Sequence, residues 1–220
     1  MKYTTFIFDL DGTLLDTLED LAAAVNYALK KNGYPIRSID EVQSFIGNGV
    51  ANLIERALGG RVDCFEKTLA DFKEYYGAHC AVKTGLYDGI EEVLLAIKAA
   101  GKKCAVVSNK ADFAVKILAK QYFDGLLGVA IGENEAAGVR KKPAPDSVFL
   151  ALKELGENSL GAVYIGDSEV DIQTAKNAGV TCICVTWGFR DKAYLMEEGG
   201  RLFVDEPNEI LTYIEGAGTR

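Results

Sequence analysis

Histidine is almost absent from this sequence, and its cysteines lack the close spacing of metal-binding or redox pairs. His79 is the only histidine among 220 residues, and no two of the five cysteines form a CxxC pair. The cysteines are Cys64, Cys80, Cys104, Cys182 and Cys184. Because a structural zinc site needs four Cys or His ligands at short spacings, this composition excludes one. We expect buried free thiols and the reducing environment of the cytoplasm.

Basic residues are outnumbered by acidic ones. The chain has 24 Lys and Arg against 32 Asp and Glu, which gives a net charge of -8 at pH 7. A surface that binds nucleic acid or an anionic membrane needs clustered Lys and Arg, so we expect neither partner. A small anionic ligand remains compatible, because one pocket can be locally positive on an acidic protein. We therefore expect a small metabolite as the partner of a monomer or homodimer.

Long hydrophobic runs are missing as well. No stretch has the length of a transmembrane helix, and the N-terminal residues reach Asp9 and Asp11 before a signal peptide could form. Hydrophobic residues nevertheless make up 49% of the chain and charged residues 25%, as in ordinary globular proteins. A chain of this length and composition can bury a core without disulfides or structural metals.

The sequence does contain short apolar runs separated by helical patterns. Six runs predict buried parallel strands, at residues 4–8, 103–107, 126–131, 162–165, 182–185 and 202–204. Helical periodicity predicts helices at residues 87–100, 111–121, 146–155, 171–178 and 208–214. Strands that alternate with helices indicate an α/β fold built on a parallel sheet.

One helical block interrupts this alternation. Between residues 16 and 83 we find no strand pattern, only helical periodicity at residues 17–32, 50–58 and 63–80. We therefore expect a helical domain at residues 16–83, inserted into an α/β core formed by residues 1–15 and 84–220. The two connections, at residues 14–17 and 83–88, are candidate hinges.

Polar side chains stand where the predicted strands end. They are DLDGT at 9–13, SNK at 108–110, KKP at 141–143 and GDS at 166–168, with Asp171 at the start of the next helix. Since parallel strands end at one edge of a sheet, we expect these groups to converge. Carboxylates for a hard cation, with hydroxyl, amide and ammonium groups for phosphate, suit Mg²⁺-assisted phosphoryl transfer. Each motif alone is also typical of an ordinary turn, so the prediction depends on their combination.

Together these motifs resemble the haloacid dehalogenase-like superfamily, which consists mostly of phosphatases. The matching segments are FDLDGT (8–13), VSNK (107–110), KKPAPD (141–146) and IGDSEVD (165–171). The resemblance extends over nearly the whole chain. It implies a Rossmann-like parallel sheet core with an inserted α-helical cap, and a phosphatase that uses Mg²⁺.

The resemblance also implies catalytic roles. Asp9 would be the nucleophile that forms an aspartyl-phosphate. Asp11 would protonate the leaving oxygen and then, as a base, activate water. Ser108 and Lys142 would bind the oxygens of the transferring phosphoryl group.

Further residues are implied as metal ligands or substrate contacts. The expected ligands of Mg²⁺ are Asp9, Asp11 through its backbone carbonyl, Asp167 and Asp171, the last of which would hold metal-bound waters or Lys142. The expected substrate-binding residues are Gly12, Thr13, Asn109 and Asn48.

The Gly47-Asn48-Gly49 turn bears on the substrate. This turn enters a helical pattern, so it could meet a small anion or only cap the helix. It and the TWGFR segment at 186–190 are similar to phosphoglycolate phosphatases, which makes phosphoglycolate the first expectation. In this interpretation Asn48 contacts the non-phosphate end of the substrate.

Several other functions stay open. Within enzymes they are a broad sugar-phosphate or nucleotide phosphatase, an inorganic pyrophosphatase and a phosphomutase. Leu21 stands where phosphoglucomutase-like relatives carry a histidine, which weakens the mutase interpretation. A phospho-acceptor signalling domain is the non-enzyme alternative, but such domains lack a helical insertion of this size. A non-catalytic binding protein on this fold would be expected to have lost a motif residue, and none is missing.

Overall fold

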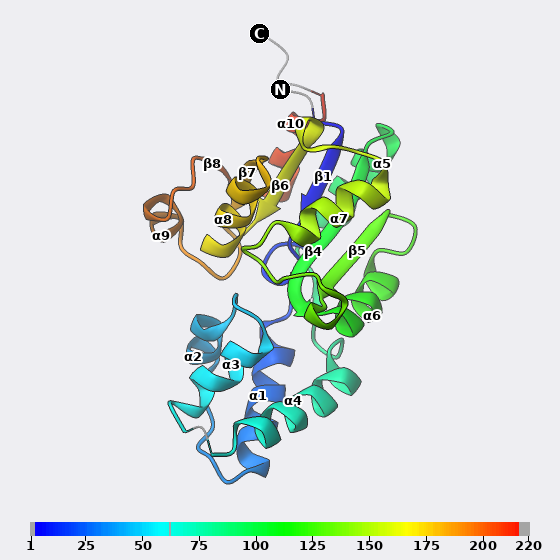
Figure 1. Cartoon of the computed structure of the whole chain (residues 1–220). Coiled ribbons are helices and arrows are strands. Elements are labelled where there is room, and N and C mark those ends of the chain that lie inside the picture. Colours follow the sequence, from blue (N-terminus) through cyan, green and yellow to red (C-terminus); the bar gives the residue numbers. More distant parts are fainter. Residues whose placement is uncertain (1–2, 62, 216–220) are drawn as a thin grey trace.

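The computed structural model describes residues 3–61 and 63–215, so residues 1–2 and 216–220 of the predicted core and residue 62 of the predicted insertion lie outside it. Its centre is a six-stranded parallel sheet of order β5-β4-β1-β6-β7-β8 (Figure 1). The strands are β1 Thr5–Phe8, β4 Lys103–Ala111, β5 Val129–Glu133, β6 Ala162–Gly166, β7 Thr181–Val185 and β8 Leu202–Val204. The predicted parallel α/β fold is therefore confirmed.

Helices cover both faces of the sheet. They are α5 Ile90–Ala99, α6 Asp112–Tyr122, α7 Asp146–Leu155, α8 Glu169–Ala178, α9 Lys192–Glu197 and α10 Leu211–Glu215, with 3-10 turns at Glu135–Ala137, Ser159–Gly161 and Pro207–Ile210. Side chains alternate across a strand, so Phe6 and Phe8 pack in the core with α5, α6 and α10, whereas Ile7 packs with α7 and α8. All four residues of β1 are buried, which explains its unbroken apolar run.

Two predicted strand boundaries were wrong by three or more residues. β4 continues four residues past Val107 and ends at Ala111, with a shift of register against β5 between these two residues. β5 begins at Val129, because Leu126 closes a turn onto the carbonyl of Phe123. The polar SNK segment therefore belongs to the irregular end of β4.

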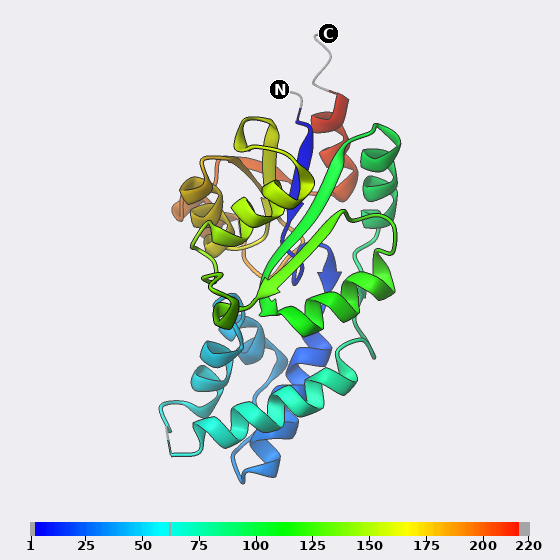
Figure 2. The ribbon, with the colours of Figure 1, turned by 45° about the vertical axis from the view of Figure 1, so that its right-hand side comes forward.

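Four helices lie beyond the end of the sheet toward which the strand arrows point (Figures 1 and 2). They are α1 Leu18–Lys31, α2 Ile39–Phe45, α3 Val50–Leu58 and α4 Phe65–His79, and we call them the four-helix segment. The pattern did not predict α2, whose start is fixed by a capping box between Ser38 and Glu41. None of the helices formed by residues 3–61 and 63–215 is long and apolar enough to cross a membrane.

The two connections to the four-helix segment lie side by side. Their strands, β2 Leu15–Asp16 and β3 Gly85–Leu86, form a short antiparallel pair that the sequence did not predict. Asp20 on α1 anchors the second connection, because its carboxylate accepts the backbone N–H groups of Val82, Lys83 and Thr84 at 2.8 to 3.1 Å. The second connection is thus hydrogen-bonded both to the first connection, through the β2–β3 pair, and to the carboxylate of Asp20 on α1.

Candidate functional site

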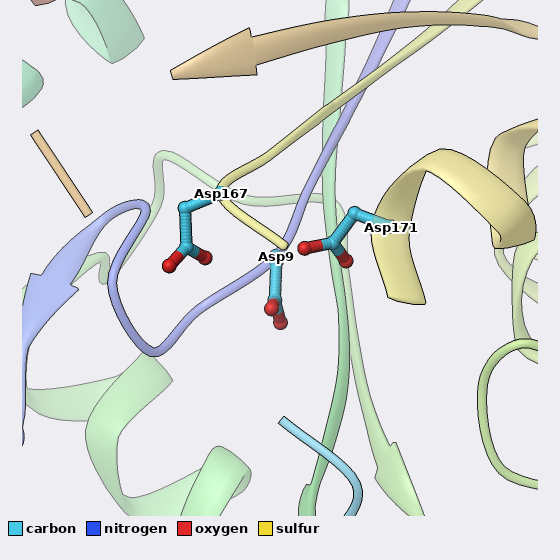
Figure 3. A group of neighbouring side chains, drawn as sticks. All are labelled: Asp9, Asp167 and Asp171. Carbon is cyan, nitrogen blue, oxygen red and sulfur yellow. The ribbon is translucent and has the colours of Figure 1, made fainter. Parts of the chain in front are cut away.

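Three carboxylates meet at the carboxyl end of the sheet, next to the place where the strand order reverses. Asp9 follows β1, Asp167 follows β6, and Asp171 points in from the first turn of α8 (Figure 3). Each offers an oxygen within 4.8 Å of the other two, and the three residues are 8%, 2% and 0% exposed. The convergence expected from the strand ends is observed.

Lys142 is the cation that joins this group. Its buried Nζ lies 2.9 Å from Oδ1 of Asp9 and 2.8 Å from Oδ1 of Asp171. The backbone N–H of Leu10 also donates to Oδ1 of Asp9 at 2.7 Å. The described residues donate hydrogen bonds to Oδ1 of Asp9 and not to Oδ2. One oxygen of Asp9 is therefore held in place while the other is left for a ligand.

Asp171 uses both of its oxygens within the protein. Oδ1 contacts Lys142 and accepts a hydrogen bond from the hydroxyl of Tyr164 at 3.1 Å. Oδ2 accepts from the hydroxyl of Ser168 at 2.6 Å and from its backbone N–H at 3.1 Å. Of the two roles implied for Asp171, these contacts favour holding Lys142; a contact with a metal or its bound waters stays a prediction.

Asp167 is held from the other side. Thr13 donates from Oγ1 to Oδ1 at 3.1 Å, and the backbone N–H of Phe189 donates to Oδ2 at 2.8 Å. Gly12 has a φ of 82° and lies so close that a Cβ would come within 2.4 Å of Oδ2. Gly12 and Thr13 thus contact Asp167, whereas the sequence predicted that they bind substrate; that predicted role stays untested.

The charges at this site fit a divalent cation. Burial raises the pKa of Asp9 to about 7; Lys142 opposes this rise, and the neighbouring Asp171 and Asp11 add to it. Burial, followed by Asp171 and Asp9, raises the pKa of Asp167 well above its usual value. For Lys142, burial lowers the pKa, but Asp171 and Asp9 outweigh it. Three buried carboxylates with one ammonium leave an excess of negative charge, which an oxygen-preferring cation would compensate.

Asp11 lies in a different environment, although it is only two residues from Asp9. Its Oδ1 accepts from Nζ of Lys110 and from the hydroxyl of Thr17, each at 2.7 Å. Its carboxylate is outside the group of three, and the expected contact of its backbone carbonyl with a metal stays a prediction. Lys110 is buried and also lies 4.7 Å from the ring centroid of Tyr76 on α4.

Sequence reasoning assigned Lys110 no role, although it ends the VSNK motif. The available signal was a lysine next to Ser108 and Asn109, just beyond the predicted strand at residues 103–107. The structure places it against Asp11, 99 positions away along the chain. Its partner Tyr76, from the four-helix segment, had no signal of its own in the sequence.

A cavity of about 60 Å³ separates these groups from the four-helix segment. Asp9, Asp11, Ser108 and Asn109 border it on the side of the sheet. Apolar side chains border it on other sides, among them Leu21, Val50, Leu53, Phe72 and Phe113. The cavity therefore combines a polar end with apolar walls.

Asn109 connects the two sides of the cavity. Its Nδ2 donates to the carbonyls of Gly47 at 3.2 Å and Lys142 at 3.0 Å, and its Oδ1 accepts from the backbone N–H of Lys142. Gly47 and Gly49 border the cavity, but Asn48 is not among its lining residues. The carbonyl of Asn48 accepts a hydrogen bond from Asn52. A contact of Asn48 with substrate therefore stays a prediction.

Known proteins resemble this chain over most of its length. The haloacid dehalogenase-like hydrolase family matches residues 6–185. A phosphoglycolate phosphatase of Colwellia psychrerythraea is 36% identical over 214 residues, which cover 93% of this chain and 94% of that protein. Phosphoglycolate phosphatase 1 of Pseudomonas aeruginosa is 33% identical over 213 residues, 93% of this chain and 77% of that protein.

Solved structures agree with these relatives. A provisionally named phosphoglycolate phosphatase from Lactobacillus delbrueckii subsp. bulgaricus superposes with a TM-score of 0.93 at 37% identity, covering 97% of this chain and 99% of that chain. The resemblance inferred from the four motifs is confirmed. This chain belongs to the haloacid dehalogenase-like hydrolase family.

Proposed function

We propose that this protein is a Mg²⁺-dependent phosphatase that hydrolyses a small phosphorylated metabolite through an aspartyl-phosphate on Asp9. The observation that carries the proposal is the arrangement of Asp9. Its Oδ1 is held by Lys142 and by the N–H of Leu10. Asp9 and Asp11 both border the cavity. A held nucleophile beside an independent acid is what two-step phosphoryl transfer needs.

In this reaction Asp9 and Asp11 make and break bonds, and Ser108 and Lys142 stabilise charge. Oδ2 of Asp9 attacks phosphorus, and the bond from phosphorus to the leaving oxygen breaks while Asp11 gives that oxygen a proton. Water then attacks the aspartyl-phosphate and gives a proton to Asp11, which restores both carboxyl groups and releases phosphate. Ser108 donates to a phosphoryl oxygen as a neutral group, and Lys142 stabilises the charge near Asp9.

Asp9 and Asp167 would hold the cation, together with the carbonyl of Asp11. Asp171 would act mainly through Lys142, because its oxygens are already engaged. When bound, Mg²⁺ would neutralise charge on the phosphate and on Asp9. The excess of buried carboxylates over ammonium groups at this site supports that assignment.

We also propose that residues 16–83 act as a cap over a core of residues 1–15 and 84–220. Two contacts support a closed position of this cap: Asn109 with the carbonyl of Gly47, and Lys110 with the ring of Tyr76. Closure would exclude bulk water while the phosphoryl group is transferred. The paired connections β2 and β3 would be the hinge.

Phosphoglycolate is our first choice of substrate. The relatives from Colwellia and Pseudomonas carry this activity in their names. A broader sugar-phosphate phosphatase, a pyrophosphatase or a phosphomutase would use the same core residues. The five free cysteines support the proposed cytoplasmic location.

A phosphate-release screen over a panel of phosphorylated metabolites tests the proposal. With Mg²⁺, we expect the wild-type protein to release phosphate, with phosphoglycolate among the best substrates. Asp9→Asn should release none, and chelation of the metal should abolish release by the wild type. Full activity after exhaustive removal of metal, or in Asp9→Asn, would refute the mechanism. A different preferred compound would refute only the choice of substrate.

A further inference from the structure

The loop after β7 contains a motif that the proposed chemistry leaves without a role. Residues 186–190, TWGFR, leave the carboxyl end of the sheet and meet the C-terminal end of α2. Gln43 on α2 donates from Nε2 to the carbonyl of Phe189 at 3.2 Å. The sheet and the four-helix segment are therefore joined at this loop.

Arg190 contacts both α2 and the start of α8 through the three nitrogens of its guanidinium group. Its Nη1 donates to the carbonyl of Gln43 at 3.3 Å, and its Nη2 to the carbonyl of Ile46 at 2.6 Å. Its Nε pairs at 3.3 Å with Glu169, at the start of α8. Gln43 lies in the last turn of α2 and Ile46 is its C-cap residue, so the guanidinium group lies at the C-terminal end of the helix, where a cation is favourable. The planar guanidinium group of arginine presents its N–H donors in fixed directions, which suits two carbonyls and a carboxylate at once.

The same loop holds Asp167. The N–H of Phe189 donates to Oδ2 of Asp167 at 2.8 Å. Gly188 packs so closely that a Cβ would lie 2.3 Å from Cβ of Asp167 and 2.5 Å from the carbonyl of Gly12. The orientation of the Asp167 carboxylate therefore depends on where residues 186–190 lie.

We propose that Arg190 is a positioning residue that clamps α2 onto the loop at residues 186–190 and thereby fixes Asp167. Movement of α2 away from the sheet removes two acceptors from Arg190 and the donor Gln43 from Phe189. The N–H that orients Asp167 then belongs to a loosened loop. Position of the four-helix segment and orientation of Asp167 are coupled in this way. The catalytic consequence rests on the proposed phosphatase function, whereas the clamp itself does not.

Hydrogen exchange measured by mass spectrometry on the full chain tests the clamp without any substrate. In Arg190→Ala, exchange in peptides that contain Phe189 and residues 43–49 should be about tenfold faster or more, because hydrogen bonds from a charged donor are lost. Arg56→Ala is the matched control. Arg56 donates to the carbonyl of Phe45 at the same helix end, but from α3 within the four-helix segment. The Arg56→Ala variant should speed hydrogen exchange near α2 and leave exchange in the Phe189 peptide unchanged.

Kinetics then test the consequence for Asp167. Arg190→Ala should raise the Mg²⁺ concentration for half-maximal activity and lower kcat/KM by about ten- to a hundredfold. Arg190→Lys keeps the charge but loses the planar guanidinium group, so it should restore the Mg²⁺ requirement and kcat/KM only in part. Arg56→Ala should change neither.

Unchanged exchange at Phe189 in a folded Arg190→Ala protein would overturn the clamp. If that variant does not fold, Gln43→Ala replaces it, because it removes the donor to Phe189 alone and must also speed exchange there. Faster exchange without any change in the Mg²⁺ requirement would refute the link to Asp167. Absence of phosphatase activity in the wild type would refute the proposed function and leave the exchange result standing.

Discussion

At the scale of single residues, Asp9 and Asp11 show how two carboxylates in one motif acquire different environments. They are two positions apart, yet Asp9 faces Lys142 within a group of carboxylates and Asp11 faces Lys110 and Thr17. Each carboxylate thus has its own lysine. This separation allows one group to act as nucleophile while the other exchanges protons, in line with the proposed mechanism.

Asp9→Asn should abolish turnover and keep the fold, because the replacement is nearly isosteric. Asp11→Asn should slow turnover by about 10²–10⁴-fold, the usual contribution of a positioned acid and base. Protection from proteolysis by beryllofluoride checks which residue accepts phosphate. Wild type should be protected and Asp9→Asn should not; equal protection of both would argue against Asp9 as the acceptor.

The ion pair between the buried Lys110 and the half-buried Asp11 should contribute to stability as well as to chemistry. Lys110→Met leaves the Asp11 carboxylate without its cation and should lower the free energy of unfolding by about 3 kcal/mol. Adding Asp11→Asn should recover part of that loss, since no charge is then left unpaired. Urea titrations of the two single variants and the double variant measure this coupling. Strictly additive losses would show that the pair acts only through packing.

At the scale of elements, the irregular end of β4 and the hinge strands decide how the site is assembled. The shift of register after Val107 lets Ser108, Asn109 and Lys110 reach different partners within one short stretch. The β2 and β3 pair brings residues 15–16 and 85–86 together. Asp20 adds the hydrogen bonds that hold the start of the second connection.

Asp20→Ala should destabilise the protein by about 1–3 kcal/mol, because three backbone N–H groups, of which that of Thr84 is buried, lose their acceptor. Exchange of the amides at residues 82–84 should accelerate. Glu19→Ala is the matched control, since Glu19 contacts the same connection only through an exposed ion pair with Lys83. Its effect should stay below about 0.5 kcal/mol. Equal losses in both variants would contradict an anchoring role for Asp20.

At the scale of the whole molecule, the buried carboxylates link stability to pH and to metal. The pKa of Asp9 is about 7 in the folded chain, against about 3.9 in an unfolded one. Between these values the folded protein binds more protons, so without metal this group makes the free energy of unfolding fall as pH rises from about 4 to 7. The raised pKa of Asp167 acts in the same direction.

Mg²⁺ should therefore raise Tm more at pH 7.5 than at pH 5.5, because it competes with protons for these carboxylates. The measurement is a thermal melt with and without Mg²⁺ at both pH values. In Asp9→Asn the difference between the two pH values should shrink. A Tm increase that is independent of pH in the wild type would contradict metal binding at these residues.

The sequence alone was enough to predict the sheet, its parallel strands and the set of polar residues at their ends. This was possible because each strand is a local apolar run, and because parallel strands bring the residues after them to one edge. Asp9, Ser108, Lys142 and Asp167 were found by this rule. The pairing of side chains, in contrast, emerged only in the folded chain. Lys110 meets Asp11 across 99 residues, and Arg190 reaches Ile46 across 144, contacts set by the packing of separate elements and recorded in no local pattern.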